Sequence, residues 1–244
     1  MKRIIIMLLL LSLYLLASSI TIAVAANVSY AIDELKKEFK KEYPNIEVRV
    51  VLGSSGKLTA QIKNGAPYGL FMSANMKYPN ALYRDNIAIT KPIVYAQGAL
   101  AFFSIKKQDF SKGLELLKSK HIKRIAIANP RTAPYGIATR EALQNANMYK
   151  KIKNKFIYGE SISQTVSYAL TAADLGIIAK SSLYSSKMSK YKKDLNWVSL
   201  NPKLYTPIKQ GIVLLKDSKD YQAFYKFMLS IKAKNILKNY GYIL

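Results

Sequence analysis

The chain has 244 residues and a net charge of +24, from 38 Lys and Arg against 14 Asp and Glu. Its lysines are spread over amphipathic segments such as residues 35–42 and 186–193, without aromatic residues interleaved on a strand platform, which argues against a nucleic-acid partner and predicts solvated faces that steer small anions. One histidine, His121, and no cysteine argue against a Ser/His/Asp hydrolase, a cysteine nucleophile, a disulfide framework and a zinc site of usual composition.

The first residues have the pattern of an export signal. A positive start is followed by an apolar core at residues 4–16 and by small residues suited to cleavage near Ser19. We therefore expect a signal peptide over residues 1–19 and a mature, soluble protein in the periplasm. A membrane anchor is the alternative, because residues 4–26 are nearly uncharged and about long enough to span a bilayer.

Beyond this start, short strand-like runs alternate with helical patterns. The strand candidates are rich in Ile, Val, Leu or Phe, and they are residues 20–25, 46–52, 70–73, 99–104, 124–128, 175–179 and 211–215. The helix candidates are residues 29–43, 57–64, 135–146, 164–172 and 221–239. This alternation predicts an α/β fold with parallel sheet, in which a ligand lies beyond the carboxyl ends of the strands.

No low-complexity linker divides the chain, although half of its residues are hydrophobic and can form a large core. Two lobes would therefore be joined by strand-like crossings and not by a flexible tether. Residues 94–98 are the candidate outward crossing, and residues 201–207 are the candidate return.

Small or polar residues follow the predicted strands at five places, which are residues 25–29, 53–56, 129–136, 160–164 and 179–181. Each alone is an ordinary helix N-cap. Together they come from both halves of the chain, as expected for a cleft that closes on a small ligand. The free N–H groups of a first helical turn, with the positive end of the helix dipole behind them, suit a phosphate-like or sulfate-like anion.

An acyl-transfer enzyme is an alternative, because Ser54 and Lys57 have the Ser-x-x-Lys spacing of penicillin-recognising acylases. Those enzymes also need Ser-Asp-Asn and Lys-Thr-Gly elements, and neither string occurs here. The candidate turns carry no carboxylate pair for glycosidase chemistry, and no acidic cluster suggests Ca²⁺ or Mg²⁺ binding. We therefore predict a protein without catalytic residues.

Several short motifs, spread over the whole exported part, agree with one family in order and spacing. The most specific is Gly65-Ala66-Pro67, followed by an apolar strand and Ser73-Ala74; the Gly53-Ser54-Ser55 turn alone would be weak. The others are residues 20–27, 56–58, 61–62, 129–130, 133–136, 141–143, 163–165, 173–176 and 240–242. On these residues the chain resembles the molybdate-binding proteins of bacterial ABC importers, which are type II periplasmic binding proteins.

The resemblance implies two Rossmann-like α/β lobes joined by two crossing strands. The first lobe would comprise residues 20–95 and 206–244, and the second lobe residues 96–205. The expected function is capture of molybdate or tungstate between the lobes by a monomer without a cofactor, followed by delivery to the membrane permease of an ABC importer.

Carried over position by position, the ligand contacts would be Asn27 and Ser55 from the first lobe and Tyr135 and Ile162 from the second. Ile162 would donate its backbone N–H, whereas for Tyr135 the amide and the phenol both stay open. These residues would bind the metal oxyanion, and no side chain would ligate the metal ion directly. The residues that adjoin this set are Ala26 and Ser54.

The chain departs from the family pattern at four positions. Asn27 stands where many relatives have Ser, and it still offers a donor. Ala179 stands where many have a Tyr hydroxyl, which Tyr135 is expected to replace from the neighbouring turn. Gly69 and Asn75 replace aspartates, and since both lie outside the predicted ligand set we expect only a structural consequence.

Neutral donors favour a fully deprotonated oxyanion, because a ligand hydroxyl would face N–H groups with nothing to accept its proton. Molybdate and tungstate should therefore bind better than phosphate. The remaining alternative on the same scaffold is a receptor for sulfate or a small organic anion.

Overall fold

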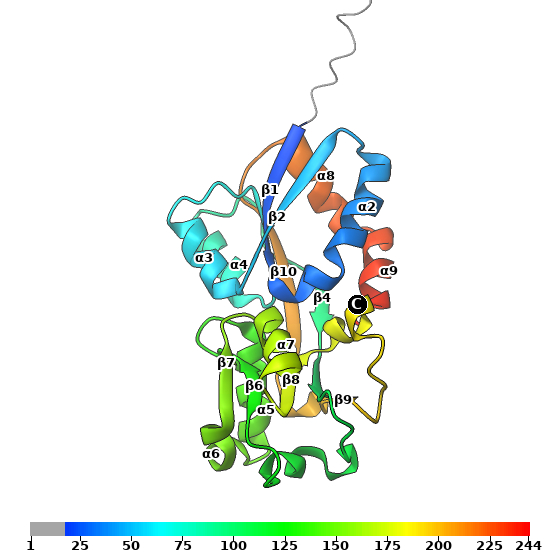
Figure 1. Ribbon diagram of the computed structural model, residues 1–244. Coiled ribbons are helices and arrows are strands. Elements are labelled where there is room, and N and C mark those ends of the chain that lie inside the picture. Colours follow the sequence, from blue (N-terminus) through cyan, green and yellow to red (C-terminus); the bar gives the residue numbers. More distant parts are fainter. Residues whose placement is uncertain (1–17) are drawn as a thin grey trace, which may run out of the picture.

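The computed structural model describes residues 18–244 and shows two α/β lobes, one above the other in Figure 1. Most of the predicted signal peptide lies outside the described residues. Its last two residues, Ser18 and Ser19, begin the first strand and pair with Ile46 and Glu47. Within residues 18–244, no helix combines the length and the apolar character needed to cross a membrane.

The first lobe has a five-stranded sheet in the order β2-β1-β3-β10-β4. Its strands are β1 (Ser18–Ala25), β2 (Ile46–Gly53), β3 (Leu70–Ser73), β4 (Ile93–Gly98) and β10 (Ile208–Leu214). Its helices are η2 (Ala26–Tyr30), α2 (Ile32–Glu42), α3 (Ser55–Lys63), α4 (Lys77–Arg84), α8 (Lys219–Met228) and α9 (Ile231–Asn239), where η denotes a 3-10 helix.

The second lobe has a sheet in the order β7-β6-β8-β5-β9. Its strands are β5 (Leu100–Phe103), β6 (Ile125–Ala128), β7 (Phe156–Gly159), β8 (Leu175–Ala179) and β9 (Trp197–Ser199). Its helices are η3 (Phe110–Lys118), α5 (Pro134–Asn145), α6 (Tyr149–Ile152), η4 (Lys153–Lys155), α7 (Ile162–Thr171), η5 (Lys180–Tyr184), η6 (Ser186–Met188) and η7 (Pro202–Leu204).

Both sheets are mixed, so the prediction of a parallel sheet is correct only for part of each. β1 pairs in parallel with β2 and β3, and β6 pairs in parallel with β7 and β8. By contrast, β10 is antiparallel to β3 and β4, and β5 is antiparallel to β8 and β9. The reversed strands, β5 and β10, are those that directly follow the two passages between the lobes. The chain enters each sheet there from the end opposite to the one where the parallel strands begin.

The two passages are short. The chain leaves the first sheet at the end of β4, at Gly98, and begins β5 at Leu100. It returns through residues 205–207 into β10, which begins at Ile208. The predicted lobe boundary after residue 95 falls inside β4, and the one after residue 205 falls just before β10.

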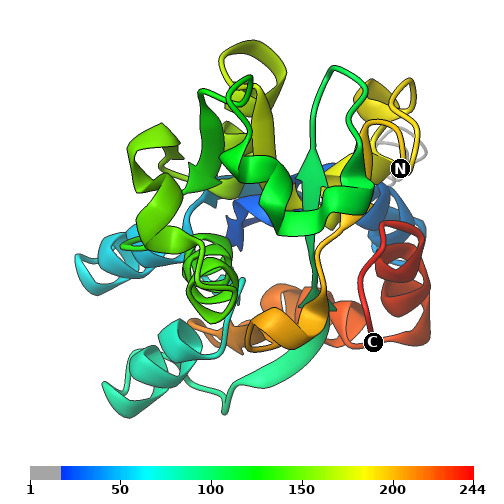
Figure 2. The same ribbon diagram turned by 90° about the horizontal axis from the view of Figure 1, so that it is seen from below.

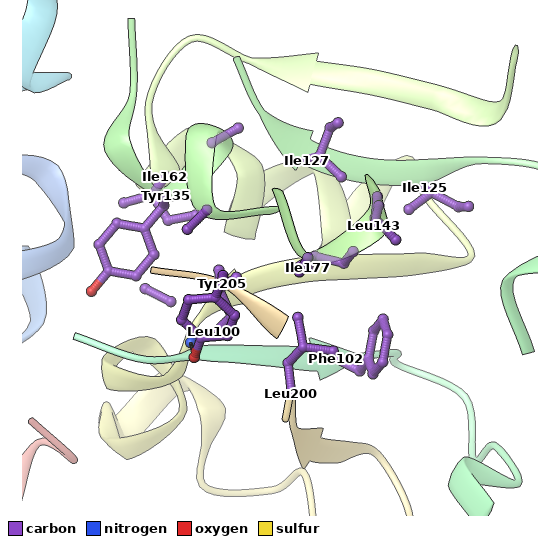
Figure 3. Packing of buried hydrophobic residues seen from close by; sticks show 14 of the residues in the cluster. Leu100, Phe102, Ile125, Ile127, Tyr135, Leu143, Ile162, Ile177, Leu200 and Tyr205 are labelled. Carbon is purple, nitrogen blue, oxygen red and sulfur yellow. Dashed lines mark hydrogen bonds between the residues drawn. The ribbon is translucent and has the colours of Figure 1, made fainter. Parts of the chain in front are cut away.

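Helices cover both faces of the first sheet. In Figures 1 and 2, α3 and α4 lie on one side of this sheet, and α2, α8 and α9 lie on the other. Phe39 of α2 packs against the rings of Phe224 and Phe227 on one face, while Leu58 and Leu82 are buried on the other. In the second lobe, Figure 3 shows one packed face, where Leu100, Ile127 and Ile177 meet.

Some boundaries differ from the predictions. The predicted strands at residues 70–73 and 175–179 coincide with β3 and β8. The single helix predicted at residues 221–239 is wrong: α8 ends before Leu229, and Ser230 accepts the Ala233 N–H as the N-cap of α9. Strands β7 and β9 were not predicted because they are only four and three residues long, and helix α4 was not predicted because Pro79 lies within it.

Candidate functional site

A small cavity lies between the two lobes at the carboxyl ends of the parallel strands. Its volume is about 10 Å³, which is about the space that one water molecule needs. The lining residues are all uncharged, and they are Ala25, Ala26, Asn27, Gly53, Ser54, Ser55, Ala74, Ala133, Pro134, Tyr135 and Ile162. All four predicted ligand residues, two from each lobe, are among them.

Four helices begin at this cavity. In the first lobe η2 follows β1 directly and α3 follows β2 after Ser54, while in the second lobe α5 and α7 follow β6 and β7. The first-turn N–H groups have no acceptor within their own helix, and the positive ends of the helix dipoles lie behind them. The sequence pattern of small residues after strands therefore corresponds, at four of its five places, to one shared cavity.

Asn27 is fully buried, and protein groups already use both hydrogens of its carboxamide. Its Nδ2 donates to Gln210 Oε1 and to Tyr242 Oη, both at 2.9 Å. The backbone carbonyl oxygen of Asn27 accepts from Tyr242 Oη at 2.8 Å and from Ser181 Oγ at 3.1 Å. Asn27 Oδ1 has no partner. The donor that Asn27 can still offer to an anion is therefore its backbone N–H.

The two serines of the α3 turn differ in their surroundings. Ser55 Oγ accepts the Ala74 N–H at 2.9 Å, so its own hydroxyl hydrogen is free to turn toward the cavity. Ser54 is the N-cap residue of α3, yet its hydroxyl makes no capping bond and has no partner although the residue is buried. Ser54 also lines a wider outer pocket of about 500 Å³ between α3 and α7. Ser54 thus lines both the small cavity and this outer pocket.

Tyr135 directs its two polar groups to different places. Its backbone N–H belongs to the first turn of α5, at the cavity. Its phenol reaches the passage between the lobes, where it accepts the Gln210 Nε2–H at 3.3 Å. A Cβ added at Gly98 would lie 2.1 Å from this phenol oxygen. In this arrangement the phenol contacts the crossing strands.

Ile162 begins α7 directly after its N-cap residue, Ser161. The Ser161 side chain accepts the Gln164 N–H, and its carbonyl accepts the Thr165 N–H. These bonds hold the first turn without using the Ile162 N–H. The side chain of Ile162 is buried in the second-lobe core near Tyr135, as Figure 3 shows.

Besides the bond from Gln210 to Tyr135, three further polar contacts join the lobes around the cavity. The Gly56 N–H of α3 donates to the Thr132 carbonyl at 3.0 Å. Lys57 pairs with Glu160 at 3.2 Å, with both side chains about half exposed. On the opposite side, Ser181 donates to Asn27, as described above. The lobes are therefore closed on a cavity smaller than a tetrahedral oxyanion, and they must separate slightly to admit one.

Burial keeps the phenols of this region neutral. It raises the pKa of Tyr95 and of Tyr135 well above the ordinary value, and neighbouring phenols add to the effect. Burial also raises the pKa of Tyr242 to about 12, although hydrogen bonds with Ser181 and Asn27 oppose it. The site therefore has no titrating tyrosine near neutral pH.

The geometry does not support the acyl-transfer alternative. The Lys57 ammonium pairs with Glu160, and the Ser54 hydroxyl has no partner. A serine nucleophile needs a base within hydrogen-bond reach. Within residues 18–244, no three His, Asp or Glu side chains gather in a group that could hold a metal ion.

The departures from the family pattern have local explanations at two positions. A Cβ at Gly69 would lie 2.0 Å from the ring of Tyr221, so a larger residue cannot stand there without displacing that ring. Asn75 Oδ1 accepts the Tyr78 N–H at 3.4 Å near the start of α4. Neither Gly69 nor Asn75 lines the cavity.

Gln210 and Tyr95 were not predicted, although Gln210 forms buried hydrogen bonds with Asn27 and Tyr135 and accepts one from Tyr95. The signal for Gln210 was present. In residues 208–214 it shares the inward face of an apolar strand with Ile208 and Ile212, where a polar side chain is unexpected.

The comparisons with known proteins agree with this arrangement. Residues 20–243 match the family of bacterial extracellular solute-binding proteins. The chain is similar to the molybdate-binding proteins ModA of Azotobacter vinelandii and Rhodobacter capsulatus, each 32% identical. The alignments cover 93% of this chain and 90% and 89% of those proteins, respectively.

Among solved structures, the chain is similar to the periplasmic molybdate-binding protein of Azotobacter vinelandii, with a TM-score of 0.83 and 29% identity over 92% of this chain and 99% of that one. The sulfate-binding protein SubI of Mycobacterium tuberculosis has a TM-score of 0.75 at 12% identity, over 92% of this chain and 86% of that one. That second likeness shows a shared fold alone.

Proposed function

Because the chain belongs to the family of bacterial extracellular solute-binding proteins, we propose that it captures molybdate, and also tungstate, between its two lobes. The observation that carries the proposal is the neutral, buried cavity on which helix starts from both lobes converge. The mature protein would act in the periplasm after cleavage near Ser19, as a monomer that delivers the anion to the permease of an ABC importer.

The proposed ligand groups are the hydroxyl of Ser55 and the backbone N–H groups of Asn27, Tyr135 and Ile162. The hydrogen bonds of the Asn27 carboxamide and of the Tyr135 phenol support the backbone assignment for these two residues. An anion that binds all four donors contacts both lobes, so its binding favours the closed state over the open one.

Neutral donors are sufficient for tight binding. A charge-assisted hydrogen bond contributes about 1.5–3 kcal/mol net, and each helix end adds about 0.3–1 kcal/mol. After the cost of lost freedom and dehydration, several such contacts correspond to binding of roughly −8 to −12 kcal/mol, that is, micromolar to nanomolar affinity. The lysines on the surface would raise the association rate without entering the site.

The test combines calorimetric titration of the purified mature protein with thermal unfolding, each with molybdate, tungstate, sulfate and phosphate. We expect molybdate and tungstate to bind and to raise the melting temperature, and phosphate to bind poorly. The double variant Asn27→Ala with Ser55→Ala should lose this shift. An unchanged shift in the double variant would refute the site, and preferential binding of sulfate or an organic anion would refute the assigned ligand.

A further inference from the structure

Gln210 is a fully buried side chain that connects the two halves of the site without lining the cavity. Its Oε1 accepts from Asn27 Nδ2 at 2.9 Å and from Tyr95 Oη at 2.8 Å. Its Nε2 donates to Tyr135 Oη at 3.3 Å. One carboxamide therefore joins a first-lobe ligand residue to a second-lobe ligand residue.

The hydrogen bonds determine which way the two carboxamides face. The Tyr242 hydroxyl donates its one hydrogen to the backbone carbonyl of Asn27, so it can only accept from the Asn27 side chain. This directs Asn27 Nδ2 toward Tyr242 and toward Gln210 Oε1. Gln210 must then present its oxygen to Asn27 and its nitrogen to Tyr135, because the reverse orientation would set two donors against each other.

The backbone around Gln210 is adapted to this contact. In the pairing of β10 with β4, Gln210 lies opposite Ala96 and Gly211 lies opposite Val94, so Tyr95 is the extra residue of a β-bulge. Bulges redirect side chains next to functional sites, and here both Tyr95 and Gln210 take part. A Cβ at Gly98 would lie 2.8 Å from Gln210 Nε2. The missing side chain at Gly98 thus makes room for the link.

We propose that Gln210 is a positioning residue that couples the two lobes: from the crossing strand β10, its carboxamide holds Asn27 and Tyr135 in the arrangement that binds the anion. The proposal rests on the proposed function for the identity of the anion. Gln210 itself donates nothing to the ligand. Its loss would leave every ligand group present but no longer fixed relative to the groups of the other lobe.

Two variants of Gln210 test this role with tungstate as the probe. Gln210→Met has a similar size and removes the hydrogen bonds, and we expect affinity to fall by about 5–150-fold, the usual range for coupling between sites. The matched control is Asn196→Leu, which removes another buried carboxamide that bonds only second-lobe groups, Ser104, Ile105 and Lys192. This control should bind tungstate as the parent protein does.

Gln210→Glu gives a readout that loss of packing cannot produce. A neutral carboxyl can accept from Asn27 and Tyr95 and donate to Tyr135, as the carboxamide does. When it ionises, its buried charge repels the oxyanion. Burial raises the pKa of such a carboxyl, so affinity should decline with rising pH between about pH 6 and pH 9. The parent protein and Gln210→Met should show no such decline, since Tyr95, Tyr135 and Tyr242 stay neutral there.

A double-mutant cycle on ligand-free protein separates this proposal from the proposed function. The free energies of unfolding of Asn27→Ala, Tyr135→Phe and the double variant should be non-additive in the parent protein and additive in the Gln210→Met background. If the parent binds neither tungstate nor molybdate, the proposed function fails, and this cycle still decides on Gln210. Additivity in the parent, parent-like affinity of Gln210→Met, or pH-independent binding by Gln210→Glu would each overturn the coupling role.

Discussion

The two lobes contribute to the cavity in different ways. On the first-lobe side, the groups are held by side-chain hydrogen bonds: the Asn27 carboxamide by Gln210 and Tyr242, and the Ser55 hydroxyl by the Ala74 N–H. On the second-lobe side, no side chain donates into the cavity, because the Tyr135 phenol lies at the crossing strands and Ile162 is apolar. That side can offer only the backbone N–H groups at the starts of α5 and α7.

This difference determines which substitutions can test the ligand contacts of each lobe. Side-chain truncation is informative in the first lobe, where it removes donors or their support. In the second lobe it leaves the N–H groups in place, so the backbone itself must be altered.

The largest effect is expected when the second-lobe backbone donor is removed. Proline at residue 162 deletes the N–H at the first position of α7, where proline fits a helix and where Ser161 already has an extended conformation. Since a charge-assisted hydrogen bond contributes about 1.5–3 kcal/mol, Ile162→Pro should weaken molybdate binding by about 10–100-fold in calorimetric titration. The control is Ile162→Ala, which shortens the side chain but keeps the N–H. Equal affinities for these two variants would show that this N–H does not contact the anion.

The next effect concerns the closing contact between the lobes. A Cβ at Gly56 would lie 2.9 Å from the Thr132 carbonyl oxygen in the other lobe, and 2.8 Å from the flexible end of Tyr78. Overpacking of this kind costs about 1–3 kcal/mol, so Gly56→Ala should weaken affinity by about tenfold. Opening of the lobes relieves the clash with Thr132, so the melting temperature should fall more with molybdate than without it. An equal fall in both conditions would place the effect within the first lobe.

Alkaline pH should lower the free energy of unfolding through the buried Tyr135 phenol between the lobes. Burial raises the pKa of Tyr135 in the folded state, whereas in the unfolded chain the phenol ionises near pH 10. Below about pH 10 the phenol is neutral in both states and adds no pH dependence. Above about pH 10 the unfolded chain releases the proton first, so the free energy of unfolding falls as pH rises.

Tyr135→Phe removes one contributor to this decline. Urea unfolding between about pH 9 and pH 11 should show a shallower loss of stability in Tyr135→Phe than in the parent protein. Other tyrosines whose pKa burial raises, among them Tyr30, Tyr95 and Tyr242, remain in the variant and contribute to the residual slope. An unchanged slope would show that the Tyr135 phenol reaches solvent.

The smallest effect is expected at the rim of the cleft. Lys57→Ala removes the pair with Glu160 across the lobes, and exposed pairs contribute about 0.2–1 kcal/mol. Affinity should fall less than about fivefold, and the difference should vanish at high salt. Lys63→Ala is the matched control, because Lys63 forms a similarly exposed pair with Asp85 inside the first lobe. If Lys63→Ala lowers affinity equally, net charge and not the interlobe pair is responsible.

The sequence alone determined the elements whose apolar runs are continuous and the turns that follow them. Residues 70–73 and 175–179 were predicted as strands and coincide with β3 and β8, because every side chain in these strands is buried. The small residues after β1 and β2 marked helix starts for a similar reason, since N-cap preferences act within a few residues. Local chemistry was sufficient for both.

The tertiary structure alone decided how those pieces meet. The antiparallel direction of β5 and β10 follows from the passage between lobes, which leaves no local pattern in the strands themselves. Likewise, the orientation of the Asn27 carboxamide depends on Tyr242, and that of the Tyr135 phenol depends on Gln210. The members of these pairs are 215 and 75 residues apart in the chain. Hydrogen bonds between such distant residues are set by packing, so a reading of neighbouring residues identifies which residues belong to the site but not which of their atoms face the ligand.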